Sequence, residues 1–170
     1  MFQLTPQEKI TKAKVLLQTR NPFFSYISTY LKFFPSETVA TMGVDRYGNC
    51  PYNPEWVKKL SMDELVFVIE HEILHLIFEH LKRRGGRSPL IWNMASDLVV
   101  NAILRESGER VPEFALFRDT EDAKKSVEQV YDELMKNIIE CRTTGSGGQR
   151  GEGSGDRKKE GLGGSEAELP

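Results

Sequence analysis

The sequence predicts an α+β domain that is mostly helical and carries one small antiparallel β-element. Capping boxes and prolines at helix starts, followed by apolar residues at helical spacing, predict the helices. A β-rich run, a turn and a second short β-run predict the strands. With 170 residues, of which 39% are hydrophobic and 28% charged, the chain suits one globular domain with one core.

Two helices are expected at the N-terminal end. Thr5-Pro6-Gln7-Glu8 combines an N-cap, a proline in the first turn and a capping-box glutamate. Asn21-Pro22 closes this helix. The aromatic-rich run 22–34 predicts a second short helix, which Pro35 ends.

A β-hairpin is expected over residues 38–52. Thr38–Val44 is β-rich, Asp45–Gly48 has the composition of a turn, and Asn49–Tyr52 can return as the paired strand. Two interpretations remain for this hairpin above the central helix. Its open edge binds an extended substrate by strand addition, or it is a purely structural cover.

Three further helices follow. The capping box Ser61-Met62-Asp63-Glu64 opens a long helix to Arg84, where two glycines stop it. Ser88-Pro89 opens a helix to about Glu106. Ser126 opens the last helix, and its apolar side comprises Val127, Val130, Tyr131, Leu134 and Ile138.

Charge and composition exclude several classes of protein. The net charge is −2 and the pI about 6.0, so no overall field favours nucleic acid as a partner. The first residues lack the pattern of a secretory signal, and polar residues interrupt the most apolar stretch, 65–78, so no membrane association is expected. The isolated Cys50 and Cys141 are typical of reduced thiols, which favours a cytoplasmic location.

The composition changes sharply at Arg142. Residues 142–170 are mostly glycine, serine and charged residues, with Leu162 and Leu169 as the only large apolar side chains. Such a segment cannot bury enough surface to offset its ordering entropy. We therefore expect a folded domain over 1–141 and a flexible linker or tail over 142–170, through which a partner protein can bind.

The motif His71-Glu72-Ile73-Leu74-His75 predicts a metal site. Two histidines four residues apart share one face of a helix, so both imidazoles can bind one zinc ion. Glu72 stands beside the first histidine, where its carboxylate reaches a zinc-bound water without binding the metal. Activated by Glu72, this water would attack a peptide carbonyl.

The alternative is that these residues are buried polar groups of a helix core. Burying two histidines and a glutamate without partners would cost several kcal/mol, which a bound metal avoids. The surrounding face is apolar and comprises Val66, Phe67, Ile69, Ile73, Leu74, Ile77 and Phe78.

A third protein ligand is needed for a catalytic zinc site. His80 lies nine residues after His71 and would point away from the His71/His75 face of a continuous helix, so we expect it to pack or cap near the helix end. Asp97 is the predicted ligand, because a bound cation gives a carboxylate on an almost wholly apolar helix a reason to stay buried. Glu79 is a weaker rival, for which a solvated or salt-bridged position is expected.

Asn93 and Asn101 lie one turn on either side of Asp97. Asn101 is expected to bind the outer nitrogen of a ligating histidine and fix its tautomer. Alternatively, Asp97 belongs only to a polar network with these two asparagines or with an arginine. The residue that stabilises the oxyanion is left open among Tyr47, Tyr52 and Tyr131.

Several blocks occur in a fixed order along residues 16–134: Asn21-Pro22-Phe23-Phe24, Met42-Gly43-Val44-Asp45, Tyr52-Asn53-Pro54-Glu55, 71–75, Trp92-Asn93-Met94-Ala95-Ser96-Asp97 and 126–134. In this the chain resembles the "putative metallopeptidase domain" of bacteria and archaea, often followed by a von Willebrand factor A-like domain. The resemblance implies a minimal zincin with Asp97 as a ligand. Compact gluzincins carry a second acid four residues after that ligand, where this sequence has Asn101.

The function expected from the sequence is that of a zinc-dependent hydrolase, a metallopeptidase acting on peptides or proteins. One alternative is a catalytically silent, zinc-stabilised interaction module, which would not require the general base Glu72. The other is a zinc-dependent RNA hydrolase like the three-histidine ribosomal-RNA maturation enzymes. His80 falls one residue short of their spacing, and the chain is not basic.

Overall fold

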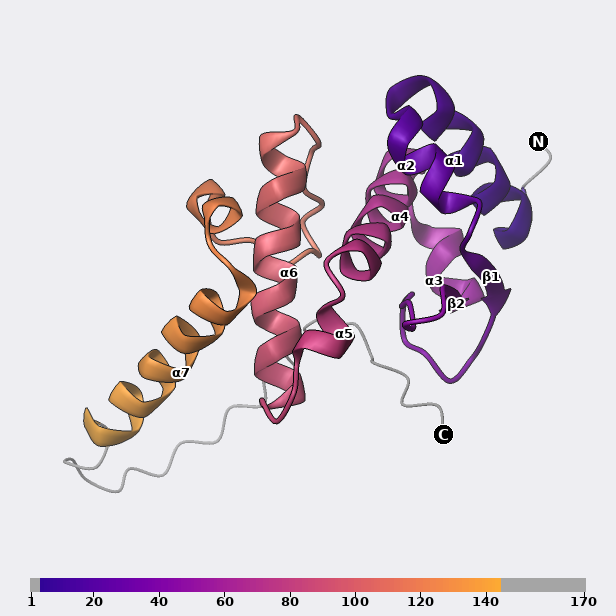
Figure 1. Ribbon diagram of the computed structural model, residues 1–170. Helices are drawn as coiled ribbons and strands as arrows, with labels where there is room; N and C mark the ends of the chain where they lie inside the picture. The colour runs from indigo at the N-terminus through magenta and orange to yellow at the C-terminus, as the bar shows by residue number, and fades with distance from the viewer. Residues whose placement is uncertain (1–3, 145–170) are drawn as a thin grey trace, which may run out of the picture.

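Helix α4 (Met62–Ile77) carries the His-Glu-x-x-His motif and lies at the centre of the structure (Figure 1). The computed structural model describes residues 4–144 and confirms a mostly helical α+β fold. The other elements are α1 (Pro6–Arg20), α2 (Pro22–Ser28), β1 (Lys32–Pro35), β2 (Asn49–Tyr52), α3 (Pro54–Lys59), α5 (His80–Arg83), α6 (Pro89–Glu106), a 3-10 helix η1 (Thr120–Lys124) and α7 (Val127–Thr144).

The predicted capping boxes are present and fix where two helices begin. The Thr5 side chain accepts a hydrogen bond from the Glu8 N–H at the start of α1, and the Glu8 carboxylate accepts from the Thr5 N–H. Ser61 and Glu64 make the same pair of bonds at the start of α4. The predicted helices at 88–106 and 126–138 correspond to α6 and to the greater part of α7.

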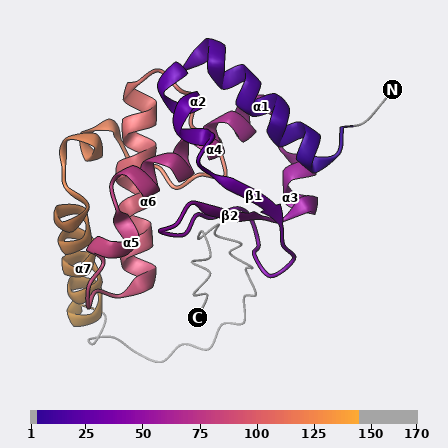
Figure 2. The ribbon, with the colours of Figure 1, turned by 45° about the vertical axis from the view of Figure 1, so that its right-hand side comes forward.

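The predicted antiparallel sheet is wrong, because β1 and β2 pair in parallel, with Lys32 opposite Asn49 and Pro35 opposite Tyr52 (Figure 2). The first strand comes from the end of the run 22–34, which we predicted as helix; α2 already ends at Ser28. A short aromatic run fits a strand as well as a helix, so periodicity does not separate the two.

The segment 41–45, here the edge segment, runs antiparallel to β2. Met42 forms a bridge with Tyr52, and the N–H groups of Gly43 and Asp45 donate to carbonyls of β2 at 3.2 and 2.9 Å. Because backbone groups alternate along an extended chain, those of Met42 and Val44 face away from β2. Within residues 4–144, these outward groups form no backbone–backbone hydrogen bond.

The helix predicted to run to Arg84 is interrupted. α4 ends at Ile77, and Glu79 adopts a left-handed backbone with φ of 52° before α5 begins. Glycine usually occupies this conformation, so a glutamate at this position does not predict a break. The chain turns here and brings α5 back beside the end of α4.

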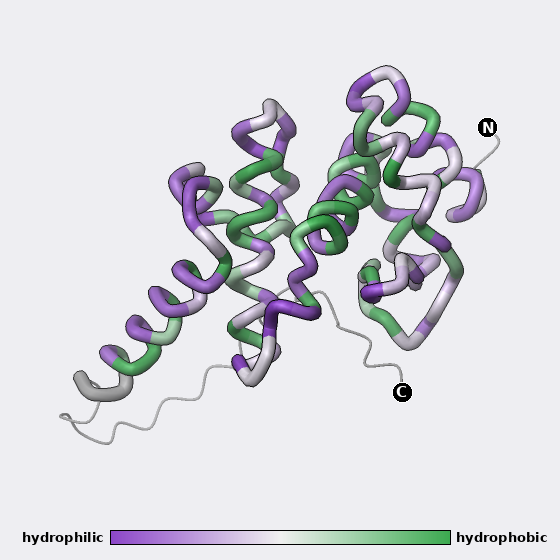
Figure 3. Tube along the Cα trace, viewed as in Figure 1, coloured by the Kyte–Doolittle hydropathy of each residue, from purple (hydrophilic) through white to green (hydrophobic). Residues whose placement is uncertain are grey.

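Two apolar clusters flank the face of α4 that carries the motif. The larger joins α4 to α1, α2 and the strands, and the smaller lies between α6 and α7. Hydrophobic residues concentrate on α4 and along α6 (Figure 3). α4 also packs directly on α6, so the polar site lies where these two helices meet. Over residues 4–144, no helix has the length and apolar character required to span a membrane.

Candidate metal centre

Three potential ligand atoms from two helices converge at this contact. The Nε2 atoms of His71 and His75 lie 2.9 Å apart, and Asp97 Oδ1 of α6 lies 3.5 and 3.2 Å from them. Ligands about 2.0–2.1 Å from a tetrahedral zinc are roughly 3.3 Å from one another. The spacing of these nitrogen and oxygen atoms therefore fits one zinc ion. Among the described residues, His71, His75 and Asp97 are the cluster of histidine, cysteine and acidic side chains that could hold a metal ion.

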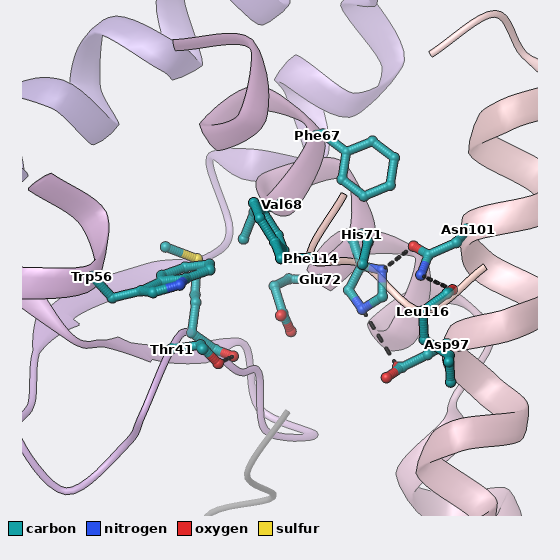
Figure 4. A pocket seen from close by; sticks show the side chains of 12 residues that line it. Thr41, Trp56, Phe67, Val68, His71, Glu72, Asp97, Asn101, Phe114 and Leu116 are labelled. Carbon is teal, nitrogen blue, oxygen red and sulfur yellow. Dashed lines mark hydrogen bonds and ion pairs between the residues drawn. The ribbon is translucent and has the colours of Figure 1, made fainter. Parts of the chain in front are cut away.

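Asn101 fixes the orientation of the His71 ring (Figure 4). Its side-chain N–H donates to the Leu116 carbonyl at 2.8 Å, so its Oδ1 faces His71 Nδ1, also at 2.8 Å. Nδ1 of His71 must then donate the hydrogen bond. In a neutral imidazole this arrangement leaves the Nε2 lone pair free for a metal.

His80 holds the second ligand ring from the other side. Its Nδ1 lies 3.1 Å from His75 Nδ1, and its backbone carbonyl accepts a hydrogen bond from Trp92 Nε1 at 2.8 Å. Burial and the neighbouring His75 lower the pKa of His80 to about 3, so it is neutral. We did not predict this contact, because a helix that continued past residue 79 would direct His80 away from His75.

Asp97 is ionised despite its burial. Burial would raise the pKa of Asp97, but hydrogen bonds from His71 and His75 hold it well below its usual range. Asn93 donates a long hydrogen bond of 3.4 Å to the other carboxylate oxygen, Oδ2. Asn93 therefore lies next to Asp97, as its i−4 spacing predicts.

The two motif histidines differ in charge in the absence of a metal. Burial lowers the pKa of His71, but the contacts with Asp97 outweigh this effect and raise it to about 9. Burial and the charge on His71 lower the pKa of His75. Metal binding requires both rings to be neutral, so it must displace a proton from His71 near neutral pH.

Glu72 adjoins the three ligand atoms without joining them. Its side chain lines a cavity together with His71 and Asp97. Burial and the negative charge of Asp97 raise its pKa to about 7, although His71 acts in the opposite direction. A carboxyl group with a pKa near the working pH is suited to accept and return a proton.

The other candidate residues lie elsewhere. Glu79 is exposed and pairs with Lys82 at 2.5 Å. The Tyr52 hydroxyl donates to Gln7. Tyr131 accepts a hydrogen bond from the Ser88 N–H, and Tyr47 is exposed on its turn. The structure brings none of the three tyrosines into the site. Arg46, which sequence reasoning did not single out, lines a second cavity beside His75.

The His-Glu-x-x-His helix and the carboxylate of α6 define a candidate metal centre of the metallopeptidase type. The chain belongs to the family described as "Putative metallopeptidase domain", which matches residues 5–168. The resemblance seen in the sequence is thereby confirmed.

A relative from Thermotoga maritima, described as an uncharacterized protein, is 26% identical over 117 residues. The matched region covers 65% of this chain and 28% of the relative, so the chain spans less than a third of that protein's length. No solved structure matches the chain. The predicted tail lies mostly outside the described residues, since α7 ends at Thr144.

Proposed function

We propose that the protein is a zinc-dependent peptidase in which His71, His75 and Asp97 hold the metal and Glu72 is the general base. The observation that carries the proposal is the convergence of three ligand atoms beside a carboxyl group that is not among them. A purely structural zinc site gains nothing from such a group. The substrates are peptides or proteins.

Zinc in this site would lower the pKa of a coordinated water and polarise the substrate carbonyl. Glu72 accepts the proton of the attacking water as its oxygen bonds to the carbonyl carbon. Glu72 then returns this proton to the amide nitrogen as the C–N bond breaks. Asn101 holds the His71 ring at its Nδ1, and His80 holds the His75 ring at its Nδ1.

The edge segment supports an extended substrate. Met42 is buried, so the open part of this edge is at Val44, whose backbone groups face away from β2 and can pair with a peptide by strand addition. Thr41 and Met42 line the same cavity as His71 and Glu72. A strand paired with this segment would therefore pass beside the general base.

Substitution of Glu72 tests the mechanism. We expect Glu72→Gln to lower peptide hydrolysis by at least ~100-fold while one zinc per chain is retained, because the base is lost but no ligand is. Glu79→Gln is the matched control, since Glu79 is exposed and lies outside the ligand cluster. Peptidase assays and elemental analysis provide the readouts. Equal turnover of zinc-loaded Glu72→Gln and wild type would contradict the proposal.

A further inference from the structure

The cavity beside Glu72 is bounded by five parts of the chain. The edge segment forms one wall, α3 a second, α4 and α6 the floor, and the segment 114–116 the remaining wall. Figure 4 shows Glu72 between Trp56 on one side and His71 on the other. The lining residues are Thr41, Met42, Trp56, Phe67, Val68, His71, Glu72, Asp97, Asn101, Phe114, Ala115 and Leu116.

This lining favours an uncharged, apolar guest. Trp56 and Phe114 meet edge to face with ring centroids 5.8 Å apart, and Phe67 and Val68 are apolar side chains of α4. Besides His71, the lining contains two ionisable side chains, the acids Glu72 and Asp97. It holds no lysine or arginine. An acidic side chain would be repelled here.

The size of the cavity limits the guest further. Its volume is about 60 Å³. One water molecule needs roughly 10–15 Å³ of such space, so about four to six heavy atoms fit. The side chains of leucine, isoleucine and methionine have this size, whereas that of tryptophan is about twice as large.

The position of the cavity connects it with a peptide strand. Met42 contributes to the cavity wall, and two residues further along the edge segment the backbone of the half-buried Val44 faces away from β2. Successive side chains of a strand point to opposite faces, so a strand paired there directs alternate residues toward α4. The second cavity, beside His75, is lined by the charged residues Asp45, Arg46, Glu79 and Lys82 and has a different character.

Resting on the proposed function, we infer that this cavity binds a leucine, isoleucine or methionine side chain next to the cleaved bond of an extended peptide. A larger side chain at Ala115 is the simplest way to make the cavity smaller. Ala115 lines the cavity and is a partly exposed loop residue, so its replacement does not disturb a helix or a strand.

The first experiment measures the affinity of amino-acid hydroxamates for the zinc-loaded Glu72→Gln protein by calorimetry. The hydroxamate group is common to the series, so differences report the side chain. We expect the leucine compound to bind at least about 10-fold more tightly than the glycine compound, from burial of one aliphatic side chain. The tryptophan and aspartate compounds should gain nothing over glycine.

Filling the cavity should remove this preference. We expect Ala115→Leu to reduce the leucine-to-glycine ratio to near one. Ala40→Leu, which adds the same volume at an exposed position outside the cavity lining, should leave it unchanged. A leucine-to-glycine ratio near one in the parent protein, or a ratio unaffected by Ala115→Leu, overturns the inference.

A readout without metal separates this inference from the proposed function. With methyl-labelled methionine, capped leucine amide should shift the Met42 resonance of the zinc-free protein and leave that of Met135 on α7 unchanged. Leucine selectivity without any peptide hydrolysis would refute the peptidase proposal alone. Hydrolysis without selectivity, and without a Met42 shift, would refute the cavity assignment alone.

Discussion

His80 is a buried side chain that would act on a metal in the candidate site through His75. Its Nδ1 contacts His75 Nδ1, while its Nε2 has no hydrogen-bond partner within the described residues. We expect His80→Phe to weaken zinc binding about 10–100-fold, because His75 loses the partner that fixes its tautomer. Chelator competition measures the affinity.

A second variant distinguishes positioning from packing. His80→Asn offers an amide near the place of the imidazole Nδ1, so it should bind zinc more tightly than His80→Phe although it fills less volume. Cobalt-substituted protein should show the same order in its visible spectrum. Equal zinc affinities for wild type and His80→Phe would exclude the positioning role.

Glu70 is a buried acid on which the opposite charge of Arg20 acts more weakly than burial. Its side chain is fully buried, and neither carboxylate oxygen has a hydrogen-bond partner within residues 4–144. Burial and the nearby Glu109 raise its pKa from 4.5 to about 8. The folded state therefore binds more protons than the unfolded state between these values, so this group's stabilisation is complete below pH 4.5 and is lost as the pH rises to about 8.

Glu70→Gln should remove this pH dependence. We expect the free energy of unfolding of the wild type to fall between pH 5 and pH 9. In Glu70→Gln this fall should be smaller by roughly 1–3 kcal/mol. Urea denaturation at the two pH values measures it, with Glu113→Gln as the exposed control. An identical fall in all three proteins would show that Glu70 does not carry a raised pKa.

At the scale of single residues, the sequence predicted which side chains meet and missed how they are supported. His71, His75 and Asp97 could be found because i, i+4 spacing and an isolated acid on an apolar helix are local signals. The contact of His80 depends on one left-handed residue, Glu79, that carries no local signal. The hydrogen bond from Asn101 to the Leu116 carbonyl could not be predicted either, because the type of a side chain does not indicate which backbone atoms its neighbours bind.

The break between α4 and α5 is the element that makes the His80 contact possible. Glu79 holds φ at 52°, a conformation that costs side-chain-bearing residues about 1 kcal/mol or more. We expect Glu79→Gly to leave the stability unchanged or raise it by up to about 1 kcal/mol. Glu79→Val should lower it by more than about 1 kcal/mol, because β-branched residues tolerate this region poorly.

Thermal unfolding compares these two variants directly. Both lose the exposed ion pair with Lys82, so its small contribution cancels. If Glu79→Val were as stable as Glu79→Gly, the left-handed turn would not persist in solution.

Strands were harder to predict than helices. Capping boxes set the starts of α1 and α4 within the local sequence. The partner of β2, in contrast, lies across the 13-residue crossover 36–48, and parallel pairing over such a distance follows from the packing of the whole chain. Asn53-Pro54, directly after β2, opens the short helix α3, which we did not predict.

At the scale of the whole molecule, the metal centre connects two halves of the hydrophobic core. His71 and His75 lie on α4, which contributes to the larger apolar cluster, and Asp97 lies on α6, which packs on α7 in the smaller one. A ligand that binds only the folded state stabilises it, by about 2.7 kcal/mol at one hundred times its dissociation constant. We therefore expect excess zinc to raise the melting temperature of the wild type by several degrees.

Asp97→Ala tests whether both helices share the ion. This variant should melt at nearly the same temperature with and without zinc, and circular dichroism would verify that it is folded. A zinc-dependent rise as large as that of the wild type would mean that Asp97 is not a ligand and that the ion stays on α4 alone.

The Asn101 side chain has a consequence for redesign of this chain. Its Oδ1 orients a ring of the metal centre, and its N–H holds the backbone of Leu116, a wall of the cavity. If the proposed function holds, catalytic rate and substrate choice are therefore not independent traits in this chain. An engineer who inserts or deletes residues near 116 would disturb both at once, whereas exchanges at Ala115 or Trp56 alter selectivity and leave that amide untouched.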